Sequence, residues 1–392
     1  MTEWKTYRLG DLVKVKGGKR LPKGISLQIA PNTHPYIRIR DMGKSRVLEL
    51  DATYEYVDDV TQKSIARYVV DEGDILLSIV GTIGLVGIVG KSLHQANQTE
   101  NCVKLVNLNG IEPLFLYYFL LSPKGQEEIK RGMVGAVQAK LPIKNIENIE
   151  ISLPSLQEQR RIAGILGAID DKIENNRRIN TNLELQAQAL YKQWFVDNRC
   201  DDWEEIKLGD IIEISKKSTT PAQSENTIFE HYSLPAFDDG IQPVFEKGKY
   251  IKSSKFILEQ NMFLFSKLNP RIKRIWLPDI QTENAICSTE FIPYKPKDIA
   301  MFGFCYSIVN SDNFYEYVLS LTNGSTGSHQ RFHPIDTLNY ELTIPNNDYI
   351  EKFESLVMPM YKEIALNRKE NRRLATLRDT LLPKLMNGEI KL

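Results

Sequence analysis

The sequence predicts an α+β protein in which two similar globular domains are joined by two long helices that form an antiparallel coiled coil. Two observations predict this fold class. Matching segments recur about 190 residues apart, and each repeat ends in a long stretch with the apolar spacing of a coiled-coil helix. The repetition therefore also predicts an internal pseudo-two-fold symmetry.

The long helices are predicted from apolar residues that recur in alternating steps of four and three, the spacing of a coiled-coil seam. The seam of the first helix contains Ile162, Leu166, Ile169, Ile173, Asn176, Asn180, Leu183, Ala187, Leu190 and Trp194. The same steps, displaced by 191 positions, give the second seam: Phe353, Val357, Met360, Ile364, Asn367, Asn371, Leu374, Arg378, Leu381 and Leu385.

Two asparagines interrupt each seam at the same steps and indicate how the helices pair. A buried Asn costs stability but fixes the register, because only a facing polar group satisfies it. In an antiparallel pair Asn176 faces Asn371. Asn180 then faces Asn367, whereas a parallel pair would match Asn176 with Asn367. We expect the antiparallel pair, since a duplicated unit closes most readily on itself with two-fold symmetry. Two ordinary amphipathic helices with polar interruptions are the alternative.

The globular parts that precede the helices also match each other, mainly at their ends. The matched segments are Trp4–Leu12 with Trp203–Ile211, Thr99–Asn101 with Thr282–Asn284, Gly135–Gln138 with Gly327–Gln330, Pro142–Ile143 with Pro334–Ile335, and Glu150–Pro154 with Glu341–Pro345. Residues 13–98 and 212–281 share little. A common scaffold with a different middle is the pattern expected of two similar domains that recognise different targets.

Within the domains, runs of β-branched and aromatic residues predict strands, and apolar runs that end at Ser-Pro or Asn predict helices. The predicted strands are Tyr36–Arg40, Tyr68–Val70, Asp74–Val80 and Leu85–Val89, the last two joined by a turn at Gly81–Gly84. The predicted helices are Leu114–Leu121, Met301–Asn310 and Asn313–Leu321. We expect the strands to be mostly antiparallel.

The composition of the chain is ordinary and does not by itself indicate a function. A hydrophobic content of 42% and a charged content of 26% are ordinary for a globular protein. Because the net charge is zero, any nucleic-acid binding must depend on local basic patches. The four scattered cysteines form no CxxC pair and predict free thiols in a reducing compartment. The charged N-terminus and the lack of a membrane-length apolar run predict a cytoplasmic protein without a membrane contact.

No catalytic or metal-binding motif stands out. The segment Gly84–Ser92 resembles a P-loop, but Leu85 stands where a Walker A motif requires Gly, so a hairpin explains its glycines better. His329 and His333 lack a neighbouring carboxylate or Cys cluster, so we expect no metal site there. Methyltransferase, dinucleotide-binding and triad patterns are also missing. The chain is therefore predicted to catalyse nothing by itself and to bind no cofactor of its own.

Basic and polar side chains on loops are the remaining candidates for a function. Basic glycine-rich loops suit phosphate contacts, and Arg, Asn and Gln can read base edges bidentately. The candidates in the first domain are Lys19, Arg20, Arg38, Arg40, Gln138 and Lys140. The candidates in the second are Lys216, Lys217, Lys267, Arg271, Lys273, Arg274, Gln330 and Arg331. Any one of them alone could be a solvated surface charge, but basic loops that recur in both repeats predict contact with DNA.

Three kinds of segment are characteristic in their place along the chain. They are Pro154–Ile162 at the start of the first long helix, the Leu-Gly-Asp segments Leu9–Asp11 and Leu208–Asp210, and the closing segment Leu381–Glu389. With the arrangement of a globular domain and a long helix occurring twice, these segments make the whole chain similar to the specificity (S) subunits of type I restriction–modification enzymes.

The resemblance implies a function and a set of partners. Each globular domain is expected to be a target-recognition domain that reads one half of a bipartite, asymmetric sequence in double-stranded DNA. The coiled coil is expected to set the gap between the halves. Two methyltransferase (M) subunits are expected to dock around this core and methylate adenine with S-adenosylmethionine. Restriction or motor (R) subunits, which use ATP and Mg, are expected to join them for phage defence.

The repeat and the resemblance together predict four segments. These are a first target-recognition domain at 1–155, a first coiled-coil helix at 156–198, a second target-recognition domain at 199–347 and a second helix at 348–392. The second helix departs from the first, because it opens with Asn346–Ile350 and carries Arg378 at a seam position. We therefore expect the two ends to hold their methyltransferases unequally.

Two other classes of function remain open. A stand-alone DNA-binding regulator with two different readers would need no large partner. An adaptor would use the coiled coil for protein contacts only, and replacing its loop Arg and Lys side chains would leave its affinity for DNA unchanged.

Overall fold

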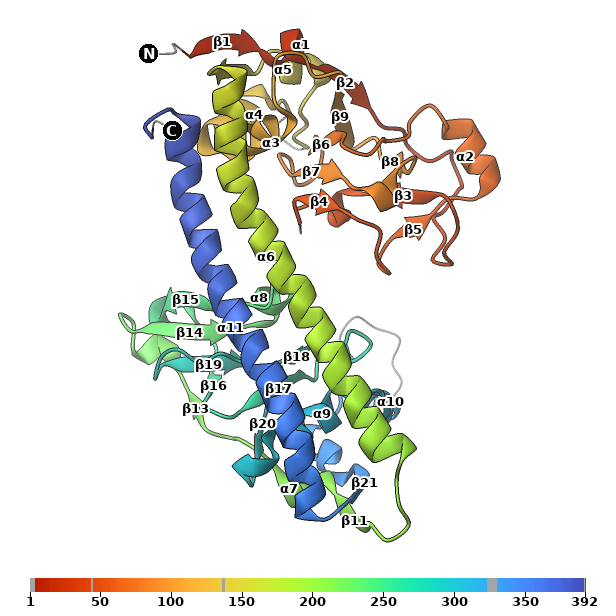
Figure 1. Ribbon diagram of the computed structural model, residues 1–392, viewed down its shortest axis with the longest axis vertical. Coiled ribbons are helices and arrows are strands. Elements are labelled where there is room, and N and C mark those ends of the chain that lie inside the picture. Colours follow the sequence, from red (N-terminus) through yellow and green to blue (C-terminus); the bar gives the residue numbers. More distant parts are fainter. Residues whose placement is uncertain (1–3, 44, 136–137, 323–329, 391) are drawn as a thin grey trace. The chain divides into compact units, whose positions relative to one another are not determined.

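The computed structural model describes residues 4–43, 45–135, 138–322, 330–390 and 392 (Figure 1). Its internal contacts divide the chain into two compact units. Unit 1 consists of Met1–Glu174 and Asn371–Leu392, and unit 2 consists of Asn175–Glu370. Both boundaries lie inside the long helices α6 (Leu156–Tyr191) and α11 (Asn347–Met386), so each unit contains one globular domain and part of each helix.

The globular domain of unit 1 begins and ends in one small sheet. Strands β1 (Lys5–Arg8) and β10 (Glu150–Leu153) pair antiparallel, so the two ends of the domain meet just before α6 begins. Ser155 Oγ accepts a hydrogen bond from Glu158 N at 3.3 Å and thereby satisfies a free N–H of the first turn of α6.

The other elements of this domain lie between those two strands. They are α1 (Leu9–Leu12), β2 (Lys14–Gly17), β3 (Pro35–Ile37), η1 (Ile39–Asp41), β4 (Val47–Leu48), β5 (Glu55–Tyr56), α2 (Asp59–Ile65), β6 (Ile75–Ser78), β7 (Val86–Val89), η2 (Lys91–Leu93), β8 (Asn97–Gln98), β9 (Cys102–Val106), α3 (Pro113–Leu121), α4 (Pro123–Gly132) and α5 (Ile143–Glu147). They form a five-stranded sheet of order β2-β9-β6-β7-β4 and a three-stranded sheet of order β5-β3-β8.

The five-stranded sheet is buried on both faces. Ile75 and Leu77 of β6 belong to the core that contains α3, whereas Leu76 between them belongs to a second core on the other face. This alternation follows from the two-residue period of a strand. The strands of this domain pair mostly antiparallel, as predicted, but β4 with β7 in the five-stranded sheet and β3 with β8 in the three-stranded sheet are parallel.

The hairpin predicted for the P-loop-like segment is confirmed. Strands β6 and β7 pair antiparallel, and Gly81 and Gly84 in the turn have φ of +77° and +93°. Ser78 Oγ closes the turn, because it donates to Thr82 O at 2.6 Å and accepts from Leu85 N at 2.8 Å. Glycine is the residue that takes positive φ at low cost, which explains the glycines here without a nucleotide.

Unit 2 repeats this plan. Its strands β11 (Glu204–Lys207) and β21 (Glu341–Ile344) pair antiparallel just before α11 begins. The remaining elements are η3 (Lys192–Asp197), α7 (Leu208–Ile211), β12 (Ile212–Ile214), β13 (Ser218–Thr219), η4 (Pro221–Gln223), β14 (Ile228–Tyr232), α8 (Leu234–Asp238), β15 (Val244–Lys247), η5 (Gly248–Tyr250), β16 (Lys255–Ile257), β17 (Phe263–Ser266), β18 (Ile275–Trp276), β19 (Ala285–Ser288), β20 (Phe291–Pro296), η6 (Ile299–Met301), α9 (Phe302–Val309), α10 (Asp312–Ser320) and η7 (Pro334–Asn339).

The strand orders of the two units correspond. The order β12-β20-β17-β18 in unit 2 matches β2-β9-β6-β7 in unit 1, and the parallel pair β14 with β19 matches β3 with β8. Unit 2 adds β13 and β16 to the second sheet, in which β15 pairs antiparallel with β14 as β5 does with β3. The internal repeat is therefore confirmed at the level of strand topology, and the difference lies in the part of the domains where the sequences diverge.

The two long helices run antiparallel within each unit, as predicted. In unit 1, Arg378 Nη1 donates to Asp170 Oδ1 at 2.8 Å, and Leu392 N donates to Glu158 Oε1 at 3.4 Å. In unit 2, Arg368 Nη2 donates to Glu184 Oε1 at 3.0 Å. Figure 1 shows α6 and α11 pairing along this direction in both units.

The seam asparagines are buried and bonded inside their units. In unit 2, Asn367 Nδ2 donates to Asn180 Oδ1 at 3.0 Å, as an antiparallel alignment requires. Asn176 Nδ2 donates to Glu370 Oε2 at 2.6 Å in the same unit. In unit 1, Asn371 Nδ2 donates to Ile173 O at 3.3 Å.

The helices at Leu114–Leu121, Met301–Asn310 and Asn313–Leu321 are confirmed as α3, α9 and α10. The strand predicted at Tyr36–Arg40 is too long. It ends at Ile37, because Asp41 accepts a hydrogen bond from Arg38 N at 2.7 Å and closes the 3-10 turn η1.

Two other predictions from the sequence are wrong. The segment Tyr68–Val70 is not a strand, since Val69 forms only an isolated bridge with Asn97. The match of Thr99–Asn101 with Thr282–Asn284 is also wrong, because the first segment follows the parallel strand β8 whereas the second precedes its counterpart β19. The segment of unit 2 that corresponds in topology is Thr289–Glu290, between β19 and β20.

Glu354 of α11 predicts a pH dependence of stability. Its carboxylate accepts hydrogen bonds from Gly303 N at 3.1 Å and Phe304 N at 2.6 Å, at the start of α9. Burial nevertheless raises the pKa of Glu354 from 4.5 to about 7. The folded protein then binds a proton that the unfolded chain releases, so stability falls as the pH rises from about 4.5 to about 7 and then levels off. We expect thermal unfolding at pH 5, 6, 7 and 8 to show this fall, and Glu354→Gln to reduce it. An equal fall of stability with pH in the wild type and in Glu354→Gln would contradict the assignment of this pH dependence to Glu354.

Candidate nucleic-acid interface

In unit 1, three loops meet where β6 and β8 end and β9 begins. Lys140 forms a bridge with Val80, just beyond β6, and Ile79 N donates to Asn101 O at 2.8 Å. Lys19 N donates to Gln98 O at 3.1 Å, which brings the loop after β2 to the same sheet end. We call Lys19, Arg20, Glu100, Gln138 and Lys140 the unit 1 loop cluster.

In unit 2, the corresponding loops meet where β17 ends and β20 begins. Arg331 forms a bridge with Leu268, in the position that Lys140 and Val80 hold in unit 1. Lys267 N donates to Glu290 O at 2.9 Å, and Asn269 N donates to Gln330 O at 2.9 Å. We call Lys267, Arg271, Glu290, Gln330 and Arg331 the unit 2 loop cluster.

The exposed members of these clusters suit contact with a polyanion. The exposed side chains are those of Lys19, Arg20, Gln138, Lys140, Arg271 and Arg331. Lys19 Nζ also lies 5.8 Å from the centroid of the Tyr68 ring, a cation–π distance. Within the recurring loops at 132–140 and 324–331, residues 136–137 and 324–329 lie outside the described residues, and His329 is among them.

Arg38 and Arg40 both contact the carboxylate of Glu55. Arg38 Nη1 lies 2.5 Å from Glu55 Oε2, and Arg40 Nη2 lies 3.3 Å from Glu55 Oε1 and 3.0 Å from Thr53 O. Their charges are therefore used in part to join β3 and η1 to β5.

Lys273 and Arg274 hold the fold of unit 2 together. Arg274 is buried and donates to both oxygens of Asp238, at 2.7 and 2.9 Å. Lys273 Nζ donates to Asn310 O at 2.6 Å and lies 5.5 Å from the Tyr315 ring centroid. Burial lowers the pKa of Lys273. Their contacts inside unit 2 give both residues a structural role beside the predicted one.

Lys216 and Lys217 follow β12 and are both exposed. Lys217 pairs with Glu259, which Lys295 also contacts at 3.1 Å. These hydrogen bonds lower the pKa of the Glu259 carboxyl. Lys216 is thus exposed, whereas Lys217 forms an ion pair with Glu259.

The acidic residues Glu100 and Glu290 were missed from the sequence. Arg20 Nε donates to Glu100 Oε1 at 2.7 Å, and Arg331 donates to both oxygens of Glu290 at 3.0 Å. The available signal was the Thr-Glu pair that precedes a buried strand in each repeat. The incorrect match with Thr282–Asn284 concealed it.

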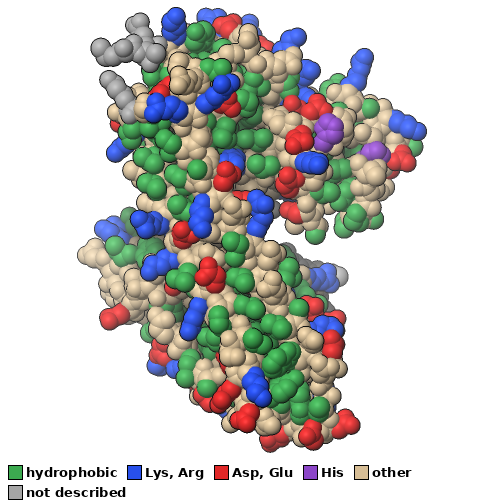
Figure 2. Space-filling model, viewed as in Figure 1, with side chains coloured by type: hydrophobic (Ala, Val, Ile, Leu, Met, Phe, Trp, Pro, Cys, Tyr) green, Lys and Arg blue, Asp and Glu red, His purple; other side chains and the backbone are tan. Residues whose placement is uncertain are grey.

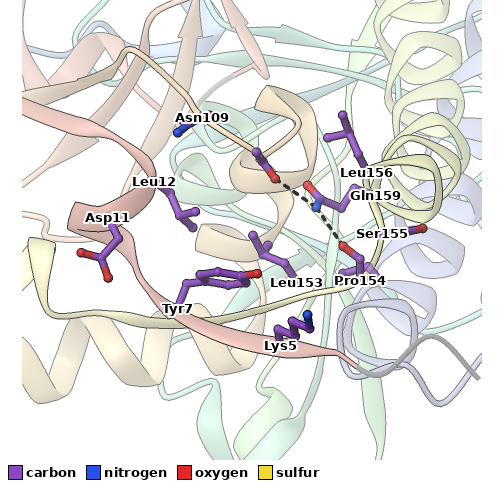
Figure 3. Close-up of a pocket in the computed structure, with 11 residues that line it drawn as sticks. Lys5, Tyr7, Asp11, Leu12, Asn109, Leu153, Pro154, Ser155, Leu156 and Gln159 are labelled. Atoms are coloured by element: carbon purple, nitrogen blue, oxygen red, sulfur yellow. Dashed lines mark hydrogen bonds between the residues drawn. The ribbon is translucent and has the colours of Figure 1, made fainter.

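A pocket of about 660 Å³ lies at the start of α6 in unit 1, apart from the loop cluster (Figure 3). Tyr7, Asp11, Leu153 and Leu156 line it, and Gln159 forms part of its wall. Gln159 is buried, accepts from Glu112 N at 2.9 Å and donates to Pro154 O at 3.0 Å. This wall fixes the first turn of α6 against the start of α3.

Charges of both signs are interspersed over the face that Figure 2 shows, in keeping with a net charge of zero. Among the described residues, no group of three or more His, Cys, Asp or Glu side chains is placed to hold a metal ion. None of the helices in the described ranges has the length and hydropathy that a membrane span requires.

Comparison with known proteins connects this architecture to one family. Residues 1–185 match the family model of the type I restriction modification DNA specificity domain. The chain is 25% identical to the type I restriction enzyme MjaIX specificity subunit of Methanocaldococcus jannaschii, with 99% of this chain and 94% of that protein covered. It is 24% identical to the HindI specificity subunit of Haemophilus influenzae, with both chains covered completely.

A solved structure shares the fold. The S subunit of a type I restriction–modification system from M. genitalium aligns with a TM-score of 0.58 and 17% identity, over 98% of this chain and 96% of that chain. The sequence and the fold thus define a two-domain protein with a paired-helix core. Residues 1–185 thus match a type I restriction modification DNA specificity domain, and the whole chain is similar in sequence to specificity subunits of type I restriction enzymes.

Proposed function

We propose that this chain recognises a bipartite sequence in double-stranded DNA, with one half-site read by the globular domain of each unit. The observation that carries this proposal is the pair of loop clusters. Each lies at the corresponding strand ends of its unit, and each combines exposed basic side chains with an amide. Such side chains can contact phosphates and base edges.

The readers we assign are the exposed cluster residues, with Arg38, Arg40, Lys216 and Lys217 beside them. Because residues 13–98 and 212–281 differ in sequence, the two domains are expected to read different half-sites. We assign DNA recognition to the domains at 1–155 and 199–347. We assign the spacing of the half-sites to the helices at 156–198 and 348–392.

The spacer role falls to α6 and α11. Each helix begins in one unit and ends in the other, so its length fixes how many residues separate the readers. The 36 residues of α6 correspond to about 54 Å of helix. The seam asparagines, with Asn367 bonded to Asn180, would hold the register on which a constant gap depends.

We assign the chemistry to partner subunits. Two adenine methyltransferase subunits, which carry S-adenosylmethionine, would dock around the helices, and restriction or motor subunits would bring ATP and Mg. The specificity subunit itself would contribute the choice of sequence.

Methylome sequencing tests the proposal directly. Cells that express this chain with its cognate methyltransferase are compared with cells that lack only this chain. We expect a split motif with modified adenine in both halves, present only when the chain is present. A contiguous motif, or the same motif without the chain, would contradict the proposal.

A further inference from the structure

An exposed arginine in each loop cluster is held by a glutamate that precedes the same central strand. In unit 1 the glutamate is Glu100, before β9, and in unit 2 it is Glu290, before β20. The arginines come from different loops, since Arg20 follows β2 and Arg331 precedes η7. Two domains with different sequences thus arrive at one arrangement.

In unit 2, the contacts of Arg331 with the described residues leave one edge of its guanidinium free to donate. Arg331 Nε donates to Glu290 Oε2 and Nη2 donates to Glu290 Oε1, both at 3.0 Å. This side-on pair uses two of the five N–H groups of the arginine. The edge formed by Nη1 and the second N–H of Nη2 can still donate two parallel hydrogen bonds, and the side chain of Arg331 is 45% exposed.

In unit 1, Arg20 is bonded to its glutamate through Nε, which does not use the edge formed by the two terminal nitrogens. Arg20 Nε donates to Glu100 Oε1 at 2.7 Å, and the Arg20 side chain is 83% exposed. Thr99 Oγ1 donates to the other oxygen of Glu100 at 3.1 Å and orients the carboxylate. Burial opposes ionisation of Glu100, but its hydrogen bonds with Arg20 and Thr99 lower its pKa overall.

A carboxylate on a DNA-binding surface needs a physical reason, because it repels phosphates. Exposed ion pairs contribute little to folding stability, so stability does not supply that reason. A carboxylate that accepts a hydrogen bond from the arginine Nε, as in both clusters, restricts the rotamers of that side chain and lowers the net charge of the pair. Both effects favour bidentate donation to guanine O6 and N7 over diffuse contact with phosphates.

We propose that Glu100 and Glu290 are positioning residues that orient Arg20 and Arg331 to read one guanine in each half-site. This inference rests on the proposed function and adds the base and the residues that select it. Glu100 and Arg20 serve the half-site of unit 1, and Glu290 and Arg331 serve the half-site of unit 2.

The test uses this chain assembled with its methyltransferase subunits and duplexes that carry the motif found by methylome sequencing. Each G·C pair of the motif is replaced in turn by A·T, and competition binding gives the discrimination at every position. The variants are Glu100→Gln, Glu290→Gln, Arg20→Ala and Arg331→Ala. The matched control is Glu205→Gln on β11, which removes an exposed ion pair with Arg199 and lies outside both clusters.

We expect Arg331→Ala to lose about 10-fold or more of the discrimination at one G·C pair. Glu290→Gln is expected to lose part of it at the same pair and to leave the other half-site unchanged. Arg20→Ala and Glu100→Gln should do the same in the other half-site. Glu205→Gln should match the wild type, and unchanged melting temperatures separate these effects from loss of folding.

Three results would overturn the inference. The first is a uniform rise in affinity for all duplexes in the glutamate variants, which would make the carboxylates simple repellents of phosphate. The second is a half-site without a G·C pair, and the third is an effect of one glutamate on both half-sites. A wild-type complex that selects no sequence would instead refute the proposed function itself.

Discussion

A complex in which both long helices carry one added heptad is expected to recognise the same two half-sites across a gap that is longer by up to about three base pairs. Seven residues add about 10 Å to a helix, and DNA rises by about 3.4 Å per base pair. A whole heptad keeps the seam in phase. The insertions belong between Arg177 and Arg178 in α6 and between Arg368 and Lys369 in α11.

These positions preserve the buried polar contacts on both sides. The bond of Asn367 with Asn180 stays on one side of the insertions, and the bonds of Asn176 with Glu370 and of Asn371 with Ile173 stay on the other. Methylome sequencing of the double insertion measures the new gap and both half-sites together.

The matched control inserts the heptad into α6 alone. The facing helices then fall out of step, so that seam asparagines lose their partners, and we expect reduced stability in place of a new gap. An unchanged gap in the double insertion would exclude the spacer role of the helices. A changed half-site would show that reading and spacing are not separate.

Heptad spacing and the repeat were sufficient to predict the coiled coil and the two similar domains, because both depend on local periodicity. Every seam position from Ile162 to Trp194 and from Phe353 to Leu385 is buried or half-buried. The strand ends were harder to predict. The strand at Tyr36–Arg40 stops because one side chain, Asp41, closes a turn, which no periodicity reports.

The contribution of single charges to the candidate interface could not be predicted from residue type. Arg274 and Arg271 stand three positions apart in the same loop, yet Arg274 is buried against Asp238 while Arg271 is exposed. The partner of Arg274 lies 36 positions away in the chain. Only the fold brings such pairs together, and the pairing of Arg331 with Glu290 is hidden from the sequence for the same reason.

Removing the carboxylate of Asp170 is expected to destabilise the protein by about 3 kcal/mol, because it leaves a charged arginine in the seam without its partner. The Asp170 side chain is 10% exposed and accepts from Arg378 Nη1 at 2.8 Å and from Tyr118 Oη at 2.7 Å. Urea unfolding of Asp170→Ala measures the loss. Asp379→Ala is the matched control, because it removes the exposed ion pair of the same arginine and should cost less than about 1 kcal/mol.

The double variant Asp170→Ala/Arg378→Leu decides what Arg378 does at its seam position. Leucine there restores the apolar spacing, so we expect the double variant to be more stable than Asp170→Ala alone, and the cycle to show a strong coupling between the two residues. If the losses in the free energy of unfolding are additive, Arg378 and Asp170 contribute to stability independently of each other. With the coupling, an intramolecular partner accounts for the departure of Arg378 from the apolar seam. The expectation that the two ends hold their methyltransferases unequally would then rest on the Asn346–Ile350 opening of α11 alone.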